Sequence, residues 1–134
     1  MYVAEKVIDA SAIMAIILNE PSRDKVIAWT RGAALVSPEM IDAEIGNGLI
    51  NLFRRHKIAE ADLLTAYQRF TEIPLRKVNA GITGALKIAC RYGIFAYDAY
   101  YLEAASRLGL PLVTLDGSMA QTGRALKLDV CGKE

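Results

Sequence analysis

The sequence has little cysteine and histidine and no long apolar run. Its 134 residues include two cysteines and one histidine, too few for a disulfide framework or for closely spaced zinc ligands. No stretch approaches the ~20 apolar residues of a membrane span. The apolar segment 12–18 lies between Asp9 and Glu20 and is too short for a signal peptide. We therefore expect a reducing, cytoplasmic location and no membrane association.

An excess of charge of one sign is also missing. The 16 basic and 15 acidic side chains give a net charge of +1, which argues against strong non-specific binding to DNA, although clustering on one face matters more than the total. Hydrophobic residues make up 53% of the chain, as expected for a globular protein. The length predicts a single domain over residues 1–134.

Residues 6–20, KVIDASAIMAIILNE, are the stretch around which the chain is organised. An apolar, strand-like segment ends at Asp9, and isoleucines then recur at helical spacing, with Ser11 placed to cap the new helix. A carboxylate at the end of a strand lies at the carboxyl edge of a sheet, where α/β proteins build their sites. Because an unpaired buried carboxylate is costly, Asp9 requires either solvent or a strong partner, and a metal ion would provide one.

Strand-like and helical segments alternate along the rest of the chain, without linkers or repeats. The patterns predict strands at 33–36, 73–78, 111–115 and 126–130, and helices at 21–31, 38–56, 60–71, 79–91, 98–108 and 117–124. Short strands separated by helices indicate a parallel sheet that is covered on both faces. We predict an α/β fold with three layers, α/β/α, around a mainly parallel central sheet.

Two acidic residues, Asp9 and Asp116, each follow an apolar strand (KVI and PLVTL). Parallel strands end at the same edge of a sheet, so these two carboxylates are expected to be neighbours despite their separation in sequence. A third acid, Asp98, opens a helix ahead of its apolar face. Each has an ordinary structural explanation as a helix cap or a turn residue.

The long helix contributes a fourth acid, Glu44. Glu44 and Asn47 lie beside the apolar face of that helix, at the border of the predicted core. Glu44 could equally be a solvated helix residue, and Asp42 lies near the apolar face without an evident reason. Taken together, however, carboxylates crowded at one place repel one another unless a cation neutralises them. Oxygen ligands favour a hard cation such as Mg²⁺ or Mn²⁺.

A resemblance to a known family rests on four segments in chain order, VIDASAIMAIILNEP, EMIDAEIGNGLINL, FAYDAYYLEAA and PLVTLDGSMA. Together they resemble the PIN domain family, and more narrowly the VapC toxins of toxin–antitoxin pairs, over residues 7–128. The resemblance implies four catalytic and metal-binding acids: Asp9, Glu44, Asp98 and Asp116. It also implies three site-ordering residues: Ser11, Asn47 and Thr114. Asp42 could compete with Glu44 for its role.

The resemblance further implies a Mg²⁺- or Mn²⁺-dependent endoribonuclease that leaves 5′-phosphate and 3′-hydroxyl ends on RNA. The family forms homodimers and is inhibited by a small VapB-like antitoxin, for which the apolar helical segments 12–18 and 41–53 could supply a groove. Both segments could equally belong to the core of the protein itself.

Two groups of residues are candidates for contact with RNA. Arg54, Arg55 and Lys57, with His56 between them, form the one basic cluster, at the end of the long helix. Cations are also favoured there by the helix dipole. Three tyrosines flank or follow Asp98 and could stack on a base or pack in the core: Tyr97, Tyr100 and Tyr101.

Other classes of protein fit the sequence less well. A phosphotransfer receiver needs a lysine at a late strand end, and PLVTLDG has none. A haloacid-dehalogenase-like phosphatase needs a second aspartate where Ser11 stands, and a serine hydrolase needs a G-x-S-x-G turn that the chain lacks. The remaining alternative is a catalytically silent PIN-like scaffold that binds RNA or protein.

Overall fold

Five short parallel strands form the centre of the fold. The computed structural model describes residues 3–132, in which the strands pair in the order β3-β2-β1-β4-β5. The strands are β1 (Glu5–Ile8), β2 (Ala34–Pro38), β3 (Leu75–Val78), β4 (Leu112–Val113) and β5 (Val130–Cys131). The central strands β1 and β4 completely bury Val7, Ile8, Leu112 and Val113, because both faces of the sheet are covered there.

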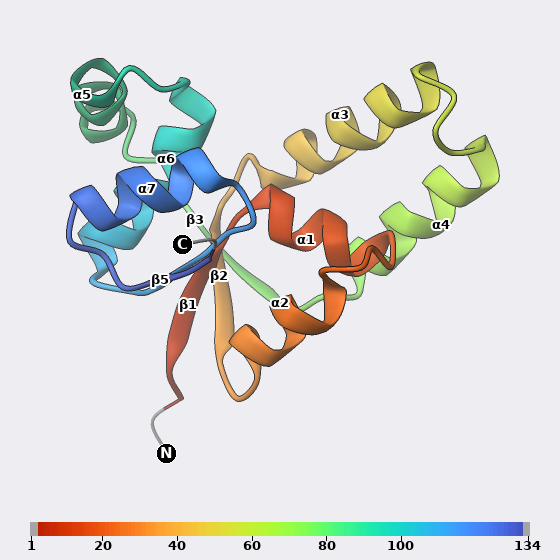
Figure 1. Cartoon of the computed structure of the whole chain (residues 1–134), viewed down its shortest axis with the longest axis horizontal. Helices are drawn as coiled ribbons and strands as arrows, with labels where there is room; N and C mark the ends of the chain where they lie inside the picture. The colour runs from red at the N-terminus through yellow and green to blue at the C-terminus, as the bar shows by residue number, and fades with distance from the viewer. Residues whose placement is uncertain (1–2, 133–134) are drawn as a thin grey trace.

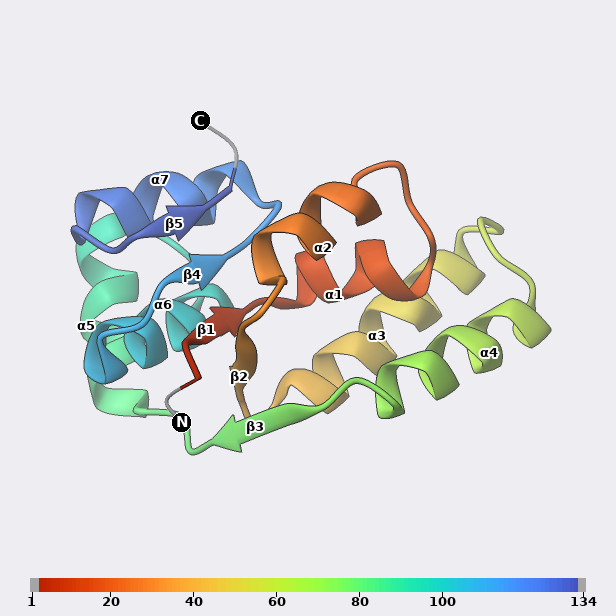
Figure 2. The same ribbon diagram turned by 90° about the horizontal axis from the view of Figure 1, so that it is seen from below.

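Helices cover both faces of this sheet. Within the described residues they are α1 (Ala10–Ile17), α2 (Arg23–Thr30), α3 (Ile41–Arg54), α4 (Glu60–Thr71), α5 (Ile82–Tyr92), α6 (Ala96–Leu108) and α7 (Gly117–Ala125). Figure 2 shows α5, α6 and α7 together on one side of the sheet and α1 to α4 on the other. The predicted three-layer α/β/α architecture is confirmed.

Helix α6 buries six of its 13 residues. It packs against β1, β2 and β4, with α5 on its outer side. On the opposite side of the sheet α1 contributes Ile13 and Ile17, which are one turn apart and almost wholly buried. Burial of a side chain of this size contributes roughly 1.5–3 kcal/mol. The two helices therefore hold the strands between them.

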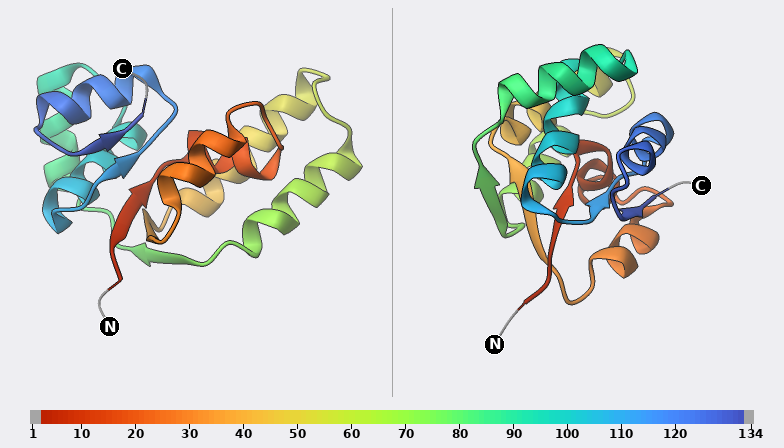
Figure 3. Two further views of the ribbon diagram at one scale, coloured as in Figure 1. Left: turned by 60° about the horizontal axis from the view of Figure 1, so that its bottom comes forward. Right: turned by 90° about the vertical axis from the view of Figure 1, so that its left-hand side faces the viewer.

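Helices α3 and α4 form a hairpin that extends away from the sheet (Figures 1 and 3). The apolar face of α3 buries Ile41, Ile45 and Leu49, and α4 buries Ala66 and Phe70. The helices of the hairpin pack on each other and on α1, so the beginning of α3 is fixed against the body of the protein.

Two helices end at glycines with a left-handed backbone. Gly93 caps α5 and Gly109 caps α6, both with φ of +66°. This left-handed conformation costs other L-residues free energy and costs glycine little.

Several predicted boundaries are wrong by two or three residues. Helix α3 begins at Ile41 because Pro38 still belongs to β2, where it is aligned with Val78 of β3. Helix α6 begins at Ala96, after the N-cap residue Phe95, so Asp98 lies in the first turn rather than at the cap.

The predicted second helix and last strand are also displaced. Pro21 lies in a turn, and α2 begins only at Arg23. The last strand is Val130–Cys131 instead of 126–130, because α7 continues to Ala125 and Lys127 then adopts a left-handed conformation with φ of +62°. The chain reverses there before it can pair with β4.

An ion pair within α6, between Glu103 and Arg107, contacts the segment that precedes α5. Glu103 is 8% exposed and accepts hydrogen bonds from the Gly81 N–H at 3.1 Å and from Arg107 Nε at 2.9 Å. Arg107 also donates to the Asn79 carbonyl oxygen at 2.9 Å. A Cβ atom at position 81 would overlap the Glu103 carboxylate, which explains the glycine there. These contacts fix α6 relative to the loop that precedes α5.

In residues 3–132, no helix has both the length and the apolar character that crossing a lipid bilayer would demand. Cys90 and Cys131 are free thiols.

Candidate active site

The strand order reverses between β1 and β4, and two of the predicted acids lie at this point. From β1 the chain continues to β2 on one side, and from β4 it continues to β5 on the other. Open α/β sheets bind ligands in the crevice at such a reversal, beyond the carboxyl ends of the strands. Ile8 is in register with Val113, so Asp9 follows one strand beside Thr114, two residues before Asp116.

Asp9 is 1% exposed and is the N-cap of α1. Its Oδ1 accepts hydrogen bonds from Ser11 Oγ at 2.7 Å and from the Ala12 N–H at 3.0 Å, and its Oδ2 accepts one from Thr114 Oγ1 at 2.5 Å. Ser11 was predicted to cap the helix, but the helix cap is Asp9, and Ser11 instead orients its carboxylate.

The same two hydroxyl groups connect Asp9 with the end of β4. Ser11 Oγ accepts from the Leu115 N–H and Thr114 Oγ1 accepts from the Asp116 N–H, each at 3.0 Å. Asp116 is the N-cap of α7 and accepts from the Met119 N–H at 2.9 Å. The helices that follow β1 and β4 are thus both capped by an aspartate, and the two caps are tied together.

The other two acids come from helices that approach this edge of the sheet. Asp98 is in the first turn of α6, where a negative charge interacts favourably with the helix dipole. Glu44 is half-buried on α3 and its Oε1 accepts a hydrogen bond from Tyr101 Oη at 2.7 Å. Tyr101 belongs to α6 and is completely buried.

The pKa values show that these carboxylates affect one another. Burial raises the pKa of Asp9 to about 6, against the lowering effect of its hydrogen bonds, and the charge of Asp116 raises it further. Burial and then the charge of Asp116 raise the pKa of Asp98. Burial likewise raises the pKa of Glu44, with a contribution from Asp98 that opposes the hydrogen bond from Tyr101. The four acids therefore form one electrostatically connected group.

Among residues 3–132, none of the four ion pairs involves an acid of this group. The four carboxylates therefore concentrate negative charge. All of their donor atoms are oxygens, which suit Mg²⁺ or Mn²⁺.

Across residues 3–132, no three acidic, histidine or cysteine side chains already surround one point that a metal ion could occupy. This geometry still fits Mg²⁺, because that ion usually keeps several water molecules and takes only one or two carboxylates directly. The acids fit such an ion through a mixture of direct and water-mediated contacts.

A hollow of about 420 Å³ opens beside Glu44 and is lined by Ala43, Glu44, Asn47 and Tyr97. Asn47 is exposed on α3, and the Tyr97 side chain is 59% exposed on α6. The Tyr97 ring meets the Tyr100 ring edge-on, with 5.7 Å between their centroids. An aromatic ring and an amide therefore face solvent next to one of the candidate ligands.

Two alternatives from the sequence are wrong. Tyr101 is 0% exposed and cannot stack on a base. Asp42 does not replace Glu44, because its Oδ2 pairs with Lys77 Nζ at 2.7 Å, whereas Glu44 is the residue whose pKa responds to Asp98.

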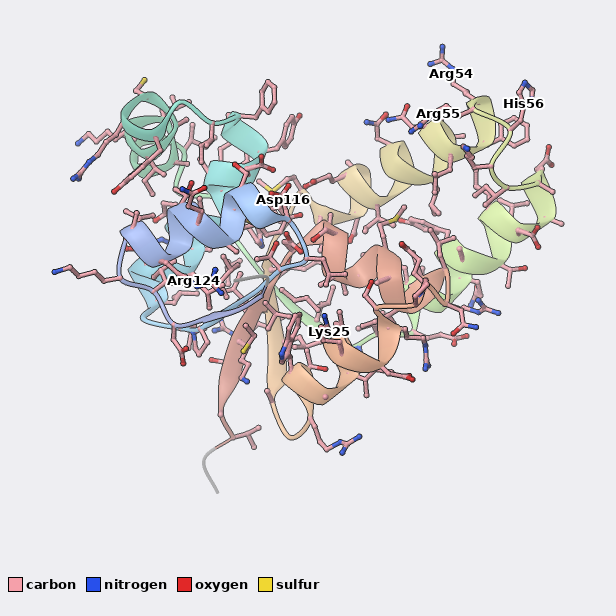
Figure 4. All side chains as sticks on the ribbon, in the orientation of Figure 1. Lys25, Arg54, Arg55, His56, Asp116 and Arg124 are labelled. Atoms are coloured by element: carbon pink, nitrogen blue, oxygen red, sulfur yellow. The ribbon has the colours of Figure 1, made fainter. Side chains whose placement is uncertain are left out.

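The basic cluster lies far from the acids. Arg54 ends α3 and Arg55 is its C-cap, and Lys57 is exposed in the turn that follows. Figure 4 shows Arg54, Arg55 and His56 at the outer end of the α3–α4 hairpin, well away from Asp116. Contact of this cluster with RNA stays a prediction.

Comparison with known proteins assigns the family. The PIN domain pattern matches residues 6–125, which is most of the chain, so this chain belongs to the PIN domain family. Within the family it is similar to Ribonuclease VapC9 of Mycobacterium tuberculosis, with 33% identity over 121 residues that cover 89% of this chain and 91% of that relative. The resemblance noted in the sequence is confirmed at the level of family.

Solved structures show the same fold. The crystal structure of PAE2754 from Pyrobaculum aerophilum has a TM-score of 0.69 and 25% identity, covering 91% of this chain and 87% of that chain. The crystal structure of FitAcB from Neisseria gonorrhoeae has a TM-score of 0.63 and 17% identity, covering 92% and 94%, and this likeness concerns the fold alone.

Sequence reasoning missed the contact between Tyr101 and Glu44. Tyr101 reads as one member of the apolar face of its helix, and its partner is 57 residues away on another helix. A tyrosine rather than phenylalanine at a fully buried position was the one available signal, because a buried hydroxyl group usually has a hydrogen-bond partner.

Asp9→Asn should change the pH dependence of stability in metal-free protein. The folded pKa of Asp9 is about 6 against an ordinary 3.8, so the folded state holds this proton more tightly than the unfolded state. Stability is therefore lost as the pH rises from about 4 to about 6, by up to about 3 kcal/mol. Urea unfolding with EDTA should show that Asp9→Asn gains stability relative to the unsubstituted protein between pH 4 and pH 7.

The matched control is Asp24→Asn, since the Asp24 side chain is 98% exposed. If the free energy of unfolding depends on pH in the same way for Asp9→Asn and for the unsubstituted protein, burial of Asp9 does not perturb its pKa.

Proposed function

We propose that this protein is a divalent-metal-dependent endoribonuclease and the toxin of a type II toxin–antitoxin pair. It hydrolyses RNA phosphodiester bonds and leaves 5′-phosphate and 3′-hydroxyl ends. The observation that carries the proposal is the group of four carboxylates that interact electrostatically and that take part in none of the ion pairs of residues 3–132. The similarity to proteins named VapC ribonucleases supports it.

The carboxylates of the protein bind the divalent cation and orient it. Oδ1 of Asp9 accepts two hydrogen bonds and Oδ2 accepts one, so Oδ2 keeps a lone pair for a cation. Glu44, Asp98 and Asp116 supply further oxygens to the same cation or to its water molecules. Mg²⁺ or Mn²⁺, when bound, lowers the pKa of a water molecule and stabilises the charge that develops on the phosphate.

RNA is the proposed substrate, with its scissile phosphate at the acids. Tyr97 stacks on a neighbouring base of the RNA. The side-chain amide of Asn47 offers that base a hydrogen-bond donor and an acceptor. Arg54, Arg55 and Lys57 contact phosphates further along the strand, because α3 carries the chain ~15 Å from Glu44 to Arg54.

Removal of the metal tests the mechanism against the silent-scaffold alternative, which needs no cleavage chemistry. EDTA should abolish cleavage of single-stranded RNA, and added Mg²⁺ should restore it and raise the melting temperature. Asp98→Asn should lower the cleavage rate by roughly 100-fold or more because it removes a carboxylate that holds the divalent cation at the phosphate.

Asp129→Asn is the matched control, since Asp129 is an exposed residue before β5, and it should retain full activity. Ligation-based sequencing of the products should detect 5′-phosphate ends. Cleavage that survives both EDTA and Asp98→Asn would exclude the metal mechanism, and tight RNA binding without any cleavage would establish the scaffold.

Tyr97→Ala should weaken RNA binding with little effect on chemistry. Stacking on one base is worth ~1–3 kcal/mol, so KM should rise about tenfold while kcat stays nearly constant. Tyr97→Phe keeps the ring and should behave like the unsubstituted protein. A loss confined to kcat in Tyr97→Ala, or an equal loss in Tyr97→Phe, would rule out base stacking.

A homodimer and a small VapB-like antitoxin are the proposed protein partners. Of the two helical segments suggested for the antitoxin groove, α1 buries Ala12, Ile13, Ala15 and Ile17 in the core. Helix α3 leaves Ile50 and Phe53 exposed and is the better candidate for an antitoxin contact.

The outer face of α5 is the candidate dimer contact. Ile82 and Leu86 are one turn apart and 54% and 47% exposed, and Leu86 borders a hollow of about 590 Å³. Leu86→Glu should therefore convert a dimer into a monomer in light-scattering measurements, whereas Leu64→Glu on α4 should leave the mass unchanged. A dimer that tolerates Leu86→Glu would place the interface elsewhere.

A further inference from the structure

The hydrogen bond between Tyr101 and Glu44 joins two helices at the candidate site. Tyr101 Oη on α6 lies 2.7 Å from Glu44 Oε1 on α3. The Tyr101 ring is completely buried, so it cannot change position without disturbing the core, whereas Glu44 is only half-buried. The rigid member of the pair is therefore the tyrosine.

Glu44 has little else to hold its carboxylate. It takes part in no ion pair among residues 3–132, and it borders the open hollow that also contains Tyr97. Repulsion from Asp98 acts on it as well. Without a donor from the core, a carboxylate in this position would turn toward solvent and away from the other acids.

Helix α6 links Tyr101 to the rest of the site. Tyr101 follows Asp98 by three residues, so both lie on neighbouring parts of one helix face. The position of α6 is itself fixed by the contacts of Glu103 with the Gly81 N–H and of Arg107 with the Asn79 carbonyl oxygen. One helix thus sets the places of Asp98 directly and of Glu44 through the tyrosine hydroxyl.

We propose that Tyr101 is a positioning residue whose hydroxyl group holds Oε1 of Glu44, so that Oε2 remains directed to the divalent cation shared with Asp98. The proposal rests on the proposed function, since it assigns Tyr101 a role toward that cation. A purely packing role for Tyr101 would need the ring and not the hydroxyl group.

Tyr101→Phe separates these roles because it removes one oxygen atom and keeps the ring. Tyr100→Phe is the matched control, with the same chemical change one residue away on the same helix and a half-buried ring. Titration with Mg²⁺ in a calorimeter should show about tenfold weaker binding for Tyr101→Phe than for Tyr100→Phe, the lower end of the effect of residues that orient metal ligands. Circular dichroism should show both variants folded.

Cleavage of single-stranded RNA gives a second measurement. The Mg²⁺ concentration that gives half-maximal cleavage should rise about tenfold in Tyr101→Phe, and saturating Mg²⁺ should restore most of kcat. A packing defect would not be rescued by metal. In the background of Glu44→Gln, Tyr101→Phe should weaken Mg²⁺ binding no further, because its partner carboxylate is gone.

The outcomes of the two proposals are distinct. If the unsubstituted protein binds neither Mg²⁺ nor Mn²⁺, the proposed metal-dependent nuclease fails. If it binds Mg²⁺ and Tyr101→Phe binds it as tightly as Tyr100→Phe, the role of Tyr101 is overturned while the proposed nuclease stands. The role of Tyr101 would also be overturned if Glu44→Gln and Tyr101→Phe together weakened Mg²⁺ binding by the sum of their separate effects. Tyr101 would then act independently of Glu44.

Discussion

Carboxylates gathered in one region repel one another, and burial makes each charge more costly. Asp9 carries the largest part of this cost, since it is almost completely buried and its pKa is raised to about 6. Its neighbours within hydrogen-bonding distance are a backbone amide and two hydroxyl groups, which stabilise the anion without cancelling its charge. The rest of the structure has to hold this arrangement against its own repulsion.

Two sets of contacts do so. At the sheet edge, Ser11 and Thr114 each contact Asp9 and also accept a backbone N–H from the segment that leads to Asp116. On the helical side, α6 packs on the sheet, carries Asp98 and contacts Glu44 through Tyr101. Glu103 also joins α6 to the N-cap residue of α5, Gly81, so the acid group rests on elements that are tied to the core and to each other.

The candidate catalytic acids and the candidate contact residues lie on different parts of the protein. The acids are held by buried elements, whereas Tyr97, Ile50, Phe53 and Leu86 are exposed on helices. The α3–α4 hairpin extends from the body and ends at Arg54 and Arg55 (Figure 4). The candidate contact surfaces therefore lie on exposed parts of the helices, apart from the buried elements that hold the acids.

Much of the fold could be predicted because its signals are local. Apolar runs that end at Asp9 and Asp116 predicted the strands β1 and β4, which are parallel in the structure. Boundaries failed where long-range contacts intervene: Pro38 remains in a strand because β3 pairs with it, and the final strand is delayed until the chain after α7 has reversed at Lys127.

The sequence by itself determined the alternation of strands and helices, the family, and the four acids in chain order, since each depends on neighbouring residues or on a recognisable pattern. Only the tertiary structure decided that Asp42 pairs with Lys77, that Tyr101 contacts Glu44, and that Arg54 and Arg55 lie far from Asp116. The physical reason is that such contacts join residues far apart in the chain. Their distances depend on how helices pack on the sheet, and no local pattern encodes that packing.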